Sequence, residues 1–411
     1  MTGRADRPTI VTLTPLALTA DSRTLKQAIS VARFGYRSVV IEGVASAMSG
    51  TRSAIEVLSV EDAVRRTPPP SGRPNAFRRL AYIGRRFAGF VGGLTRIVRI
   101  APKADLYYLH AFYQFPAVFV LCLRHRAKMI YDAHDFYGRM SDGGALSAFQ
   151  RLVALPAEGL IERACVRCAD AVLTVNEGIA ALLKNRFGCD ARILRNFHDR
   201  RLDVAPRQTI RETLGLPAGA FLVVSIGNWK AGMAIDQMFE AMAGLPCEVH
   251  LAFLGKGYPD LSAAVAARGL TGRVHVVPAV LPQEVVPYIA TADASVVLYY
   301  GKSINDQNAL PNRFFQAIAA ELPLLYPDLL EMRRVAERHS IGTMVDPRAP
   351  AQIAAALRRL IEDPQARAAM RARSRIAANA LSWANEEIAL RGILESSLGA
   401  PVPASRAPAS A

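Results

Sequence analysis

The hydrophobic positions of this chain form two kinds of pattern that alternate along most of its length. Short unbroken apolar runs predict buried strands, and apolar residues spaced three and four apart predict amphipathic helices. Such alternation is typical of βαβ units built around a parallel sheet. A helix is expected over Arg23–Phe34, between the first two strands. The strands predicted in the first half of the chain are Thr9–Leu16, Ser38–Glu42, Leu106–Leu109, Lys128–Asp132, Ala171–Val175 and Arg192–Leu194.

The same pattern begins again after a polar segment, residues 196–213, which contains Pro206 and many charges. We take this segment as the boundary between two Rossmann-like lobes of an α/β fold, residues 1–200 and 207–380, that face a cleft. A chain of 411 residues is long enough for two such domains. A last helix, residues 381–398, is expected to cross back, and the tail, residues 399–411, is expected to be disordered. The second series of strands is Phe221–Ile226, Glu248–Leu254, Arg273–Val277, Ala294–Leu298 and Leu324–Tyr326.

The charge of the chain is strongly positive, at +15 with a pI near 10.0, and much of it lies in one segment. Every charged residue between positions 65 and 103 is basic, which predicts an anionic partner. Within residues 77–99, apolar residues recur at helical spacing and arginines fill much of the remainder, as in a helix that lies on an anionic bilayer. Four glycines weaken this helix. The apolar positions are Phe77, Leu80, Phe87, Val91, Leu94 and Val98.

Two other interpretations of this basic segment remain. It could be an ordinary domain helix with a solvated basic face, or it could contact nucleic acid. The chain contains no nucleic-acid recognition motif, so we expect no nucleic-acid partner.

The cysteines and the N-terminal segment indicate a reducing, cytoplasmic location. Five scattered cysteines do not resemble a disulfide framework. Cys165 and Cys168 form a lone C-x-x-C without the second pair that zinc needs, and we interpret them as partly buried thiols on one helix face. Residues 1–8 lack a signal-peptide core, and no apolar run reaches the roughly 18–20 residues that span a bilayer.

In open α/β sheets, ligands bind at the carboxyl ends of the strands. The segments in those places resemble, in order, the motifs of family 4 (group 1) glycosyltransferases. This resemblance implies the GT-B fold and retaining transfer of a sugar from a nucleotide sugar, without a metal or other cofactor. The matching segments are Asp21-Ser22-Arg23, His110 within residues 105–116, Tyr131-Asp132-Ala133-His134-Asp135, Asp170-Ala171-Val172, Gly255-Lys256-Gly257, Asn308-Ala309-Leu310-Pro311-Asn312-Arg313, and Trp383 with Glu386 and Glu387.

The donor diphosphate is expected at the start of a helix that has Pro311 in its first turn and runs through Ala320. Backbone N–H groups there, including that of Asn312, would cradle phosphate, and Arg313 adds a positive charge. The resemblance places Gln316 where the family has a ribose-binding Glu. It places Asn308 at the position of the family's acidic residue near the sugar.

The first loop of the second lobe, which begins at Gly227, is expected to complete the donor site. Many relatives have an Arg and a Lys in this loop. This chain has Asn228 at the Arg position, and Lys230 is within reach as a substitute. The alternative for Lys230 is a solvated loop lysine. The base is expected to be bound by the backbone of residues 277–280.

His110 and His134 each end a predicted strand and are candidates to orient the acceptor hydroxyl. Many relatives have H-x-H where this chain has His110 followed by Ala111 and Phe112, so His134 is the better candidate. A buried structural histidine is the alternative for each. Asp132 and Asp135 lie on one tight turn, which is weak evidence for a metal.

These features give three hypotheses. The first is an active transferase that uses a UDP- or GDP-linked sugar and a lipid-linked or saccharide acceptor at the inner face of the plasma membrane, in surface polysaccharide synthesis. The second is a degenerate scaffold that binds a nucleotide sugar or a partner enzyme, which is favoured by Gln316, Asn308 and by Glu321, where the family usually has Gly. The third is another GT-B reaction, such as epimerisation of a sugar nucleotide.

Overall fold

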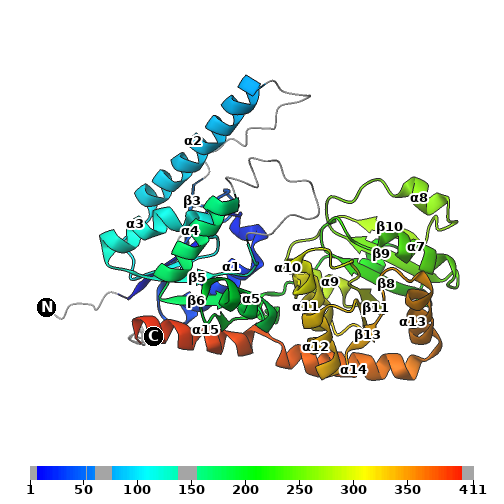
Figure 1. The fold of residues 1–411 in the computed structure, drawn as a ribbon. Helices are drawn as coiled ribbons and strands as arrows, with labels where there is room; N and C mark the ends of the chain where they lie inside the picture. The colour runs from blue at the N-terminus through cyan, green and yellow to red at the C-terminus, as the bar shows by residue number, and fades with distance from the viewer. Residues whose placement is uncertain (1–6, 52, 61–75, 138–154, 400–411) are drawn as a thin grey trace, which may run out of the picture.

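The computed structural model describes residues 7–51, 53–60, 76–137 and 155–399. It contains two lobes, each with a parallel sheet covered by helices on both faces (Figure 1). The two-lobed α/β architecture predicted from the alternating pattern is therefore confirmed. No described helix has both the length and the apolar character needed to cross a membrane.

The N-terminal lobe is built on seven parallel strands in the order β3-β2-β1-β4-β5-β6-β7. Leu13 of β1 is level with Leu109 of β4, and Leu109 is level with Tyr131 of β5, so three neighbouring strands end at one edge. His110, just after β4, and Asp132, the last residue of β5, therefore lie at the same edge of the sheet. The strands are β1 (Thr9–Thr14), β2 (Arg37–Glu42), β3 (Ile55–Ser59), β4 (Leu106–Leu109), β5 (Lys128–Asp132), β6 (Ala171–Thr174) and β7 (Arg192–Ile193), and the helices are α1 (Ser22–Arg33), α2 (Ala76–Ile100), α3 (Phe115–His125), α4 (Leu155–Cys168) and α5 (Glu177–Phe187).

The C-terminal lobe has six parallel strands in the order β10-β9-β8-β11-β12-β13. Its strands are β8 (Phe221–Ile226), β9 (Val249–Leu254), β10 (Val274–Val277), β11 (Ala294–Val296), β12 (Leu324–Tyr326) and β13 (Gly342–Met344). Its helices are α6 (Ile210–Thr213), α7 (Ile235–Ala243), α8 (Ser262–Ala266), α9 (Val285–Ile289), α10 (Ile304–Gln307), α11 (Asn312–Ala319), α12 (Leu330–His339), α13 (Pro350–Glu362) and α14 (Pro364–Ala380).

The last helix, α15 (Trp383–Leu398), leaves the second lobe and packs beneath the first (Figure 1). Trp383 is fully buried, and its indole N–H donates to the Ser30 hydroxyl of α1 at 2.9 Å. Leu390 and Leu394 belong to the same core cluster as Ile10 of β1. The prediction that the last helix crosses back to the first lobe is therefore confirmed. The tail that was predicted to be disordered lies, after Gly399, outside the described residues.

The expected basic helix forms, as α2, whereas the expectation for the two thiols differs from the structure. The four glycines do not interrupt α2. Leu94, Ile97 and Val98 pack on the core of the N-terminal lobe, and this packing outweighs the low helix propensity of glycine. Cys165 is buried whereas Cys168, the last residue of α4, is exposed. The two thiols therefore do not share one partly buried environment.

Candidate active site

A buried ion pair organises the first lobe where β4 and β5 end. The Asp132 carboxylate accepts hydrogen bonds from Arg23 Nε at 3.0 Å and Arg23 Nη2 at 2.9 Å. It also accepts from Gln27 Nε2 at 3.1 Å and from the Tyr108 hydroxyl at 3.0 Å. Asp132 is fully buried and Arg23 is 5% exposed. Such charges are stable inside a protein only when they are paired and hydrogen-bonded, as they are here.

This network sets the electrostatic state of His110, whose Nδ1 lies 3.7 Å from Asp132 Oδ2. Burial lowers the pKa of His110 to about 4, against the opposing effect of Asp132. Burial raises the pKa of Asp132, but the charge of Arg23 and its hydrogen bonds outweigh this effect and leave the pKa well below its usual range. At neutral pH, His110 is therefore a neutral imidazole beside a carboxylate.

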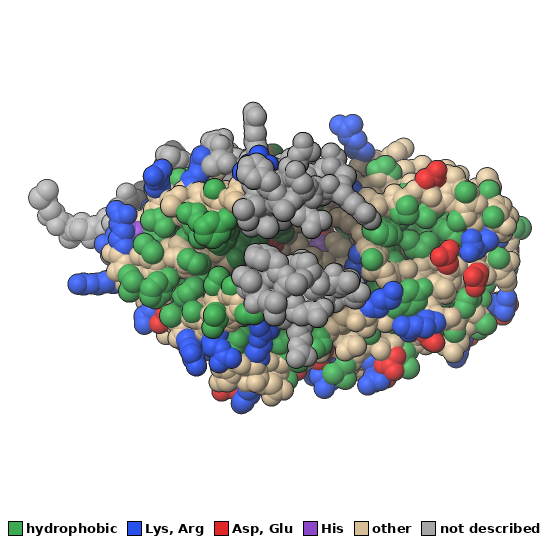
Figure 2. All heavy atoms as spheres, turned by 45° about the horizontal axis from the view of Figure 1, so that its top comes forward, with side chains coloured by type: hydrophobic (Ala, Val, Ile, Leu, Met, Phe, Trp, Pro, Cys, Tyr) green, Lys and Arg blue, Asp and Glu red, His purple; other side chains and the backbone are tan. Residues whose placement is uncertain are grey.

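The two predicted acceptor histidines lie together, with ring centroids 6.0 Å apart. His110 Nε2 and His134 Nδ1 are both buried, and neither has a hydrogen-bond partner among the described residues. Buried polar atoms are rarely left unpaired. These two nitrogens are therefore available to a polar group of a bound molecule. Figure 2 shows a histidine side chain in the hollow between the lobes.

His110, Asp132 and His134 offer ligand atoms within 4.8 Å of one another, which is compact enough to consider a metal. However, Asp132 already receives both donors of Arg23 on its two oxygens. A divalent cation would have to compete with that buried guanidinium. The donor set therefore fits a cation site poorly.

Sequence reasoning missed the residues that hold this network. The Asp21-Ser22-Arg23 segment was recognised as a family motif but was given no role. In the structure, Asp21 caps α1 by accepting from the Thr24 backbone N–H at 3.1 Å, and this cap positions Arg23. The motif itself was the signal that could have identified Arg23.

The second lobe contributes a guanidinium beside a glycine loop. Arg313 Nη2 donates to the Asn228 carbonyl at 3.1 Å, and no carboxylate among the described residues pairs with Arg313. Gly227 has a φ of +101°, and a Cβ there would lie 3.0 Å from the guanidinium. Gly255 is equally constrained, because a Cβ would lie 2.3 Å from the Gly227 carbonyl oxygen. The glycines allow Arg313 to lie directly on the loop.

Pro311 is the N-cap of α11 rather than a residue of its first turn, since its ψ of 153° is extended. The helix therefore begins at Asn312, one residue later than expected. Asn312 Nδ2 contacts Ser22 Oγ of the first lobe at 3.4 Å. Gln316 is half-buried on α11. The N-terminus of this helix has no side-chain cap, so backbone donors remain at the end where phosphate was predicted.

Lys230 is partly exposed but is held by two neighbours. Its Nζ pairs with Asp306 Oδ1 at 2.7 Å and lies 4.2 Å from the centroid of the Tyr299 ring. Asp306 belongs to α10. The sequence did not identify it, because the family resemblance aligns Asn308, two positions later, with the acidic residue. A carboxylate is therefore present close to the expected position, but it neutralises the lysine that was predicted to bind phosphate.

Asn308 lies where the two lobes touch. Its backbone carbonyl accepts from Asn176 Nδ2 of the first lobe at 2.7 Å. Its side chain donates to the Ile304 carbonyl at 2.9 Å. A Cβ at Gly178 would come within 2.1 Å of Asn308 Oδ1. The described structure thus gives Asn308 a contact between lobes.

A second contact joins α10 to the loop after β5. The Phe136 backbone N–H donates to Asn305 Oδ1 at 2.8 Å, and Asn305 Nδ2 donates to the Phe136 carbonyl at 3.3 Å. Phe136 lies two residues after His134, and Asn305 is next to Asp306. The histidine loop and the Lys230–Asp306 pair are therefore held near each other across the lobes.

Glu321, at the position where the family usually has Gly, has a φ of +61°. This left-handed conformation favours glycine. Ion pairs to Arg200 at 3.2 Å and Arg375 at 2.7 Å accompany the strained backbone. The departure from the family pattern is therefore structural and lies after the end of α11.

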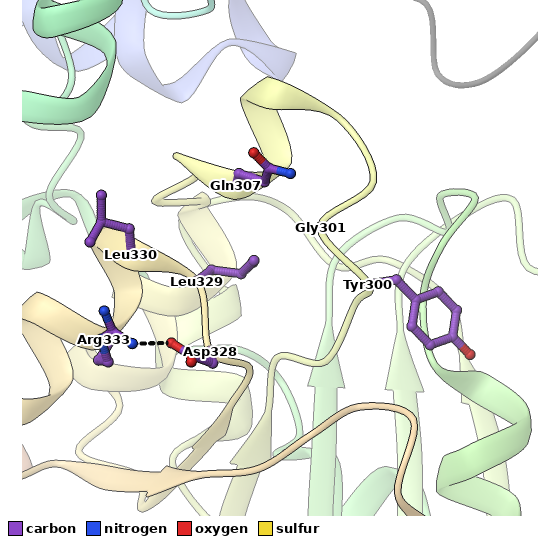
Figure 3. A pocket seen from close by; sticks show the side chains of 7 residues that line it. All are labelled: Tyr300, Gly301, Gln307, Asp328, Leu329, Leu330 and Arg333. Atoms are coloured by element: carbon purple, nitrogen blue, oxygen red, sulfur yellow. Dashed lines mark hydrogen bonds and ion pairs between the residues drawn. The ribbon is translucent and has the colours of Figure 1, made fainter.

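A separate pocket of about 400 Å³ opens beyond β11 and β12 (Figure 3). Arg333 in its wall pairs with Asp328 at 2.6 Å, and Tyr300 points away from the other side chains. The lining includes none of the predicted donor residues. It consists of Tyr300, Gly301, Gln307, Asp328, Leu329, Leu330 and Arg333.

Two family models together match most of the chain. Residues 220–363 match the family model described as "Glycosyl transferases group 1", and residues 4–196 match "Glycosyl transferase 4-like domain". Alpha-D-kanosaminyltransferase of Streptomyces kanamyceticus is 26% identical over 178 residues, 40% of this chain and 42% of that protein. The match thus spans less than half the length of that relative.

Two solved structures superpose on nearly the whole chain. Sucrose-phosphate synthase of Thermosynechococcus elongatus has a TM-score of 0.73 at 16% identity, over 95% of this chain and 99% of that one. Anabaena HepE in complex with UDP-glucose has a TM-score of 0.69 at 15% identity, over 95% and 100%. At these identities the likeness shows the fold, which is the two-lobed GT-B architecture.

Proposed function

Because the chain belongs to the family 4 (group 1) glycosyltransferases and has their GT-B fold, we propose that it moves a sugar from a UDP- or GDP-linked donor to a saccharide or lipid-linked acceptor. One observation carries this proposal. Arg313, in the first turn of α11, has no carboxylate partner among the described residues and lies against Gly227 of the loop after β8. A diphosphate would provide the missing negative charge. The similar fold of HepE, which is seen with UDP-glucose, supports a nucleotide-sugar donor.

On the donor side, the leaving diphosphate gains negative charge as the glycosidic bond breaks. Arg313 and the backbone donors of α11 would stabilise that charge. Gln316 would hydrogen-bond the ribose, and the backbone of residues 277–280 would bind the base. The proposed transfer needs no metal, which is supported by the engagement of Asp132 with Arg23.

On the acceptor side, His110 and His134 would orient the attacking hydroxyl through the nitrogens that lack described partners. In retaining transfer, the departing phosphate can take the hydroxyl proton. A neutral His110 suits a role as hydrogen-bond acceptor, because no proton has to leave it first. Retention of the anomeric configuration is part of this proposal.

We place the enzyme at the cytoplasmic, inner face of the plasma membrane, where it would act in surface polysaccharide synthesis. Residues 77–99 would contact anionic lipid. Arg85 and Arg99 are exposed on α2, which contains no acidic residue, and this supports the assignment. Nucleic acid is not part of the proposal.

A thermal-shift screen with UDP, GDP, ADP, TDP and their sugars tests the donor site. A ligand at 100 times its dissociation constant stabilises the fold by roughly 2.7 kcal/mol. We expect a shift with UDP or GDP that Arg313→Ala and Gln316→Ala abolish. Arg338→Ala and Gln365→Ala, which replace exposed residues of α12 and α14, are matched controls that should keep it. A thermal shift that persists in Arg313→Ala would show that the nucleotide does not bind at the start of α11.

A second function is favoured by the Lys230–Asp306 pair, which leaves the glycine loop with less positive charge. In this alternative the chain is a degenerate scaffold that binds a nucleotide sugar or a partner enzyme. Nucleotide binding without release of nucleoside diphosphate, with saccharide acceptors and lipid-linked acceptors alike, would favour the scaffold over the transferase.

A further inference from the structure

Helix α3 presents an apolar face to solvent. Phe119, Val120 and Leu123 are 39%, 47% and 67% exposed. The opposite face is buried, with Val118 and Leu121 in the core of the first lobe. A helix that is apolar on all sides normally has partners on all sides. The outward face of α3 therefore has no partner among the described residues.

Helix α2 shows the same feature in its middle. Leu94 and Ile97 pack on the lobe, and Phe87, Phe90 and Val91 continue the same stripe one to two turns earlier. Those three side chains are 67%, 38% and 41% exposed. Figure 1 shows α2 extending beyond the body of the first lobe. The apolar stripe is thus longer than the core that it covers.

The two faces belong to neighbouring helices, since α2 and α3 pack against each other. We call them together the α2–α3 apolar surface, which consists of Phe87, Phe90, Val91, Phe119, Val120 and Leu123. Figure 2 shows hydrophobic side chains gathered on the N-terminal lobe with Lys and Arg side chains among and around them. Apolar side chains that are exposed together on neighbouring helices are typical of contact sites.

The charged residues of the two helices are all basic. Arg85 and Arg99 on α2 and Arg124 on α3 are exposed. Neither helix contains Asp or Glu. Aromatic and aliphatic side chains with arginines beside them fit the boundary between the headgroups and acyl chains of an anionic bilayer. A nucleic acid would leave the apolar groups without a partner.

We propose that the α2–α3 apolar surface inserts into an anionic lipid bilayer, with the outward face of α3 supplying as much of the contact as α2. This inference rests on the membrane-bound acceptor of the proposed function and identifies the part of the lobe that enters the lipid. It adds α3, which the basic segment 77–99 does not include.

Sedimentation of the purified full-length chain with vesicles tests this. The vesicles contain phosphatidylcholine with or without phosphatidylglycerol. The wild type should bind the anionic vesicles. The double variants Phe119→Ser/Leu123→Ser and Phe87→Ser/Phe90→Ser should each bind about tenfold or more weakly, because apolar burial is lost. Ile376→Ser/Ile388→Ser is the matched control, because both side chains are 69% exposed on α14 and α15.

The outcomes separate the inference from the proposed function. Unchanged vesicle binding by the α3 double variant, or equal loss in the control, would overturn the role of α3. Absence of binding by the wild type, or binding to neutral vesicles alone, would overturn the surface as an anionic-lipid contact. The nucleotide thermal shift is measured on the same preparations. If the shift is intact while vesicle binding is absent, only this inference fails. If the shift is absent while the vesicle results are as expected, only the donor site fails.

Discussion

Arg23 and Asp132 join the first helix of the chain to its fifth strand through two parallel hydrogen bonds of 3.0 and 2.9 Å inside the first lobe. Arg23 Nη2 also donates to the Leu194 carbonyl at 3.0 Å, near the point where the chain leaves this lobe. One guanidinium thus connects the His110 environment to the segment between the lobes. Through Asp132, whose Oδ2 lies 3.7 Å from His110 Nδ1, the pair also borders the histidine that is proposed to orient the acceptor.

Replacing Asp132 with Asn should lower the free energy of unfolding by about 3–5 kcal/mol, because a buried Arg23 loses its counter-charge. Urea unfolding measures this change. Asp190→Asn is the control, since its pair with Lys184 is largely exposed and its loss should leave the free energy of unfolding almost unchanged. Equal effects of the two substitutions would contradict the importance given to the buried pair.

The stability of the fold should fall as the pH drops from 6.5 to about 4, in part because of His110. The unfolded histidine takes up a proton near pH 6.5, whereas the folded one stays neutral down to a pKa of about 4. The unfolded state therefore binds more protons in this window, which costs the folded state up to about 3 kcal/mol. Urea unfolding of wild type and His110→Gln across the window isolates this contribution. Parallel pH curves for the two proteins would show that His110 titrates normally.

Gly178→Ala should disturb the contact between the lobes. The new Cβ would lie 2.1 Å from Asn308 Oδ1 and 3.0 Å from Glu331 Oε1, so the Asn308 side chain has to move and the Glu331 side chain has to give slightly. We expect a loss of about 1–3 kcal/mol in unfolding free energy and a larger radius of gyration by small-angle scattering. Gly219→Ala is the matched control, because nothing lies within 4 Å of its Cβ. Asn308→Ala in the Gly178→Ala background should restore part of the loss, and failure to do so would place the clash elsewhere.

Lys230 and Asp306 give a prediction about the donor. Asp306→Asn should release Lys230 from its 2.7 Å ion pair and strengthen binding of the unglycosylated nucleotide by about two- to fivefold, the value of a partly exposed pair. Lys230→Ala should weaken the same binding. Isothermal titration measures both. If neither substitution alters the affinity, Lys230 does not contact the diphosphate.

The sheet positions could be predicted because most central strands are unbroken apolar runs. Phe221–Ile226 was located to the residue for this reason. Strands β3 and β13 were missed, and both are short strands at a sheet edge. β3 has Glu56 as its second residue, and β13 is partly exposed and begins with Gly342. A short edge strand need not carry a recognisable apolar pattern.

The site was only partly predictable. His110 and His134 could be placed at one edge because parallel strands end together. The partner of each charged residue could not be predicted, because such pairing depends on which loops meet in space. Lys230 was assigned to phosphate without knowledge of Asp306, and Asn308 was assigned to the sugar although it lies at the contact between lobes. Both lie in the loops before α7 and α11, where tertiary contacts decide the geometry.

The position of α15 reverses the order in which the lobes can be completed. The cluster around Ile10 and Tyr108 closes only when Trp383 and Leu394 reach it. During synthesis, the part of this cluster that α15 covers is therefore exposed while the strands of the second lobe emerge and pair. The N-terminal lobe is thus synthesised first, but its core is completed only after the C-terminal lobe has been synthesised. Its exposed apolar side has to be protected from other chains until residues 383–398 have left the ribosome.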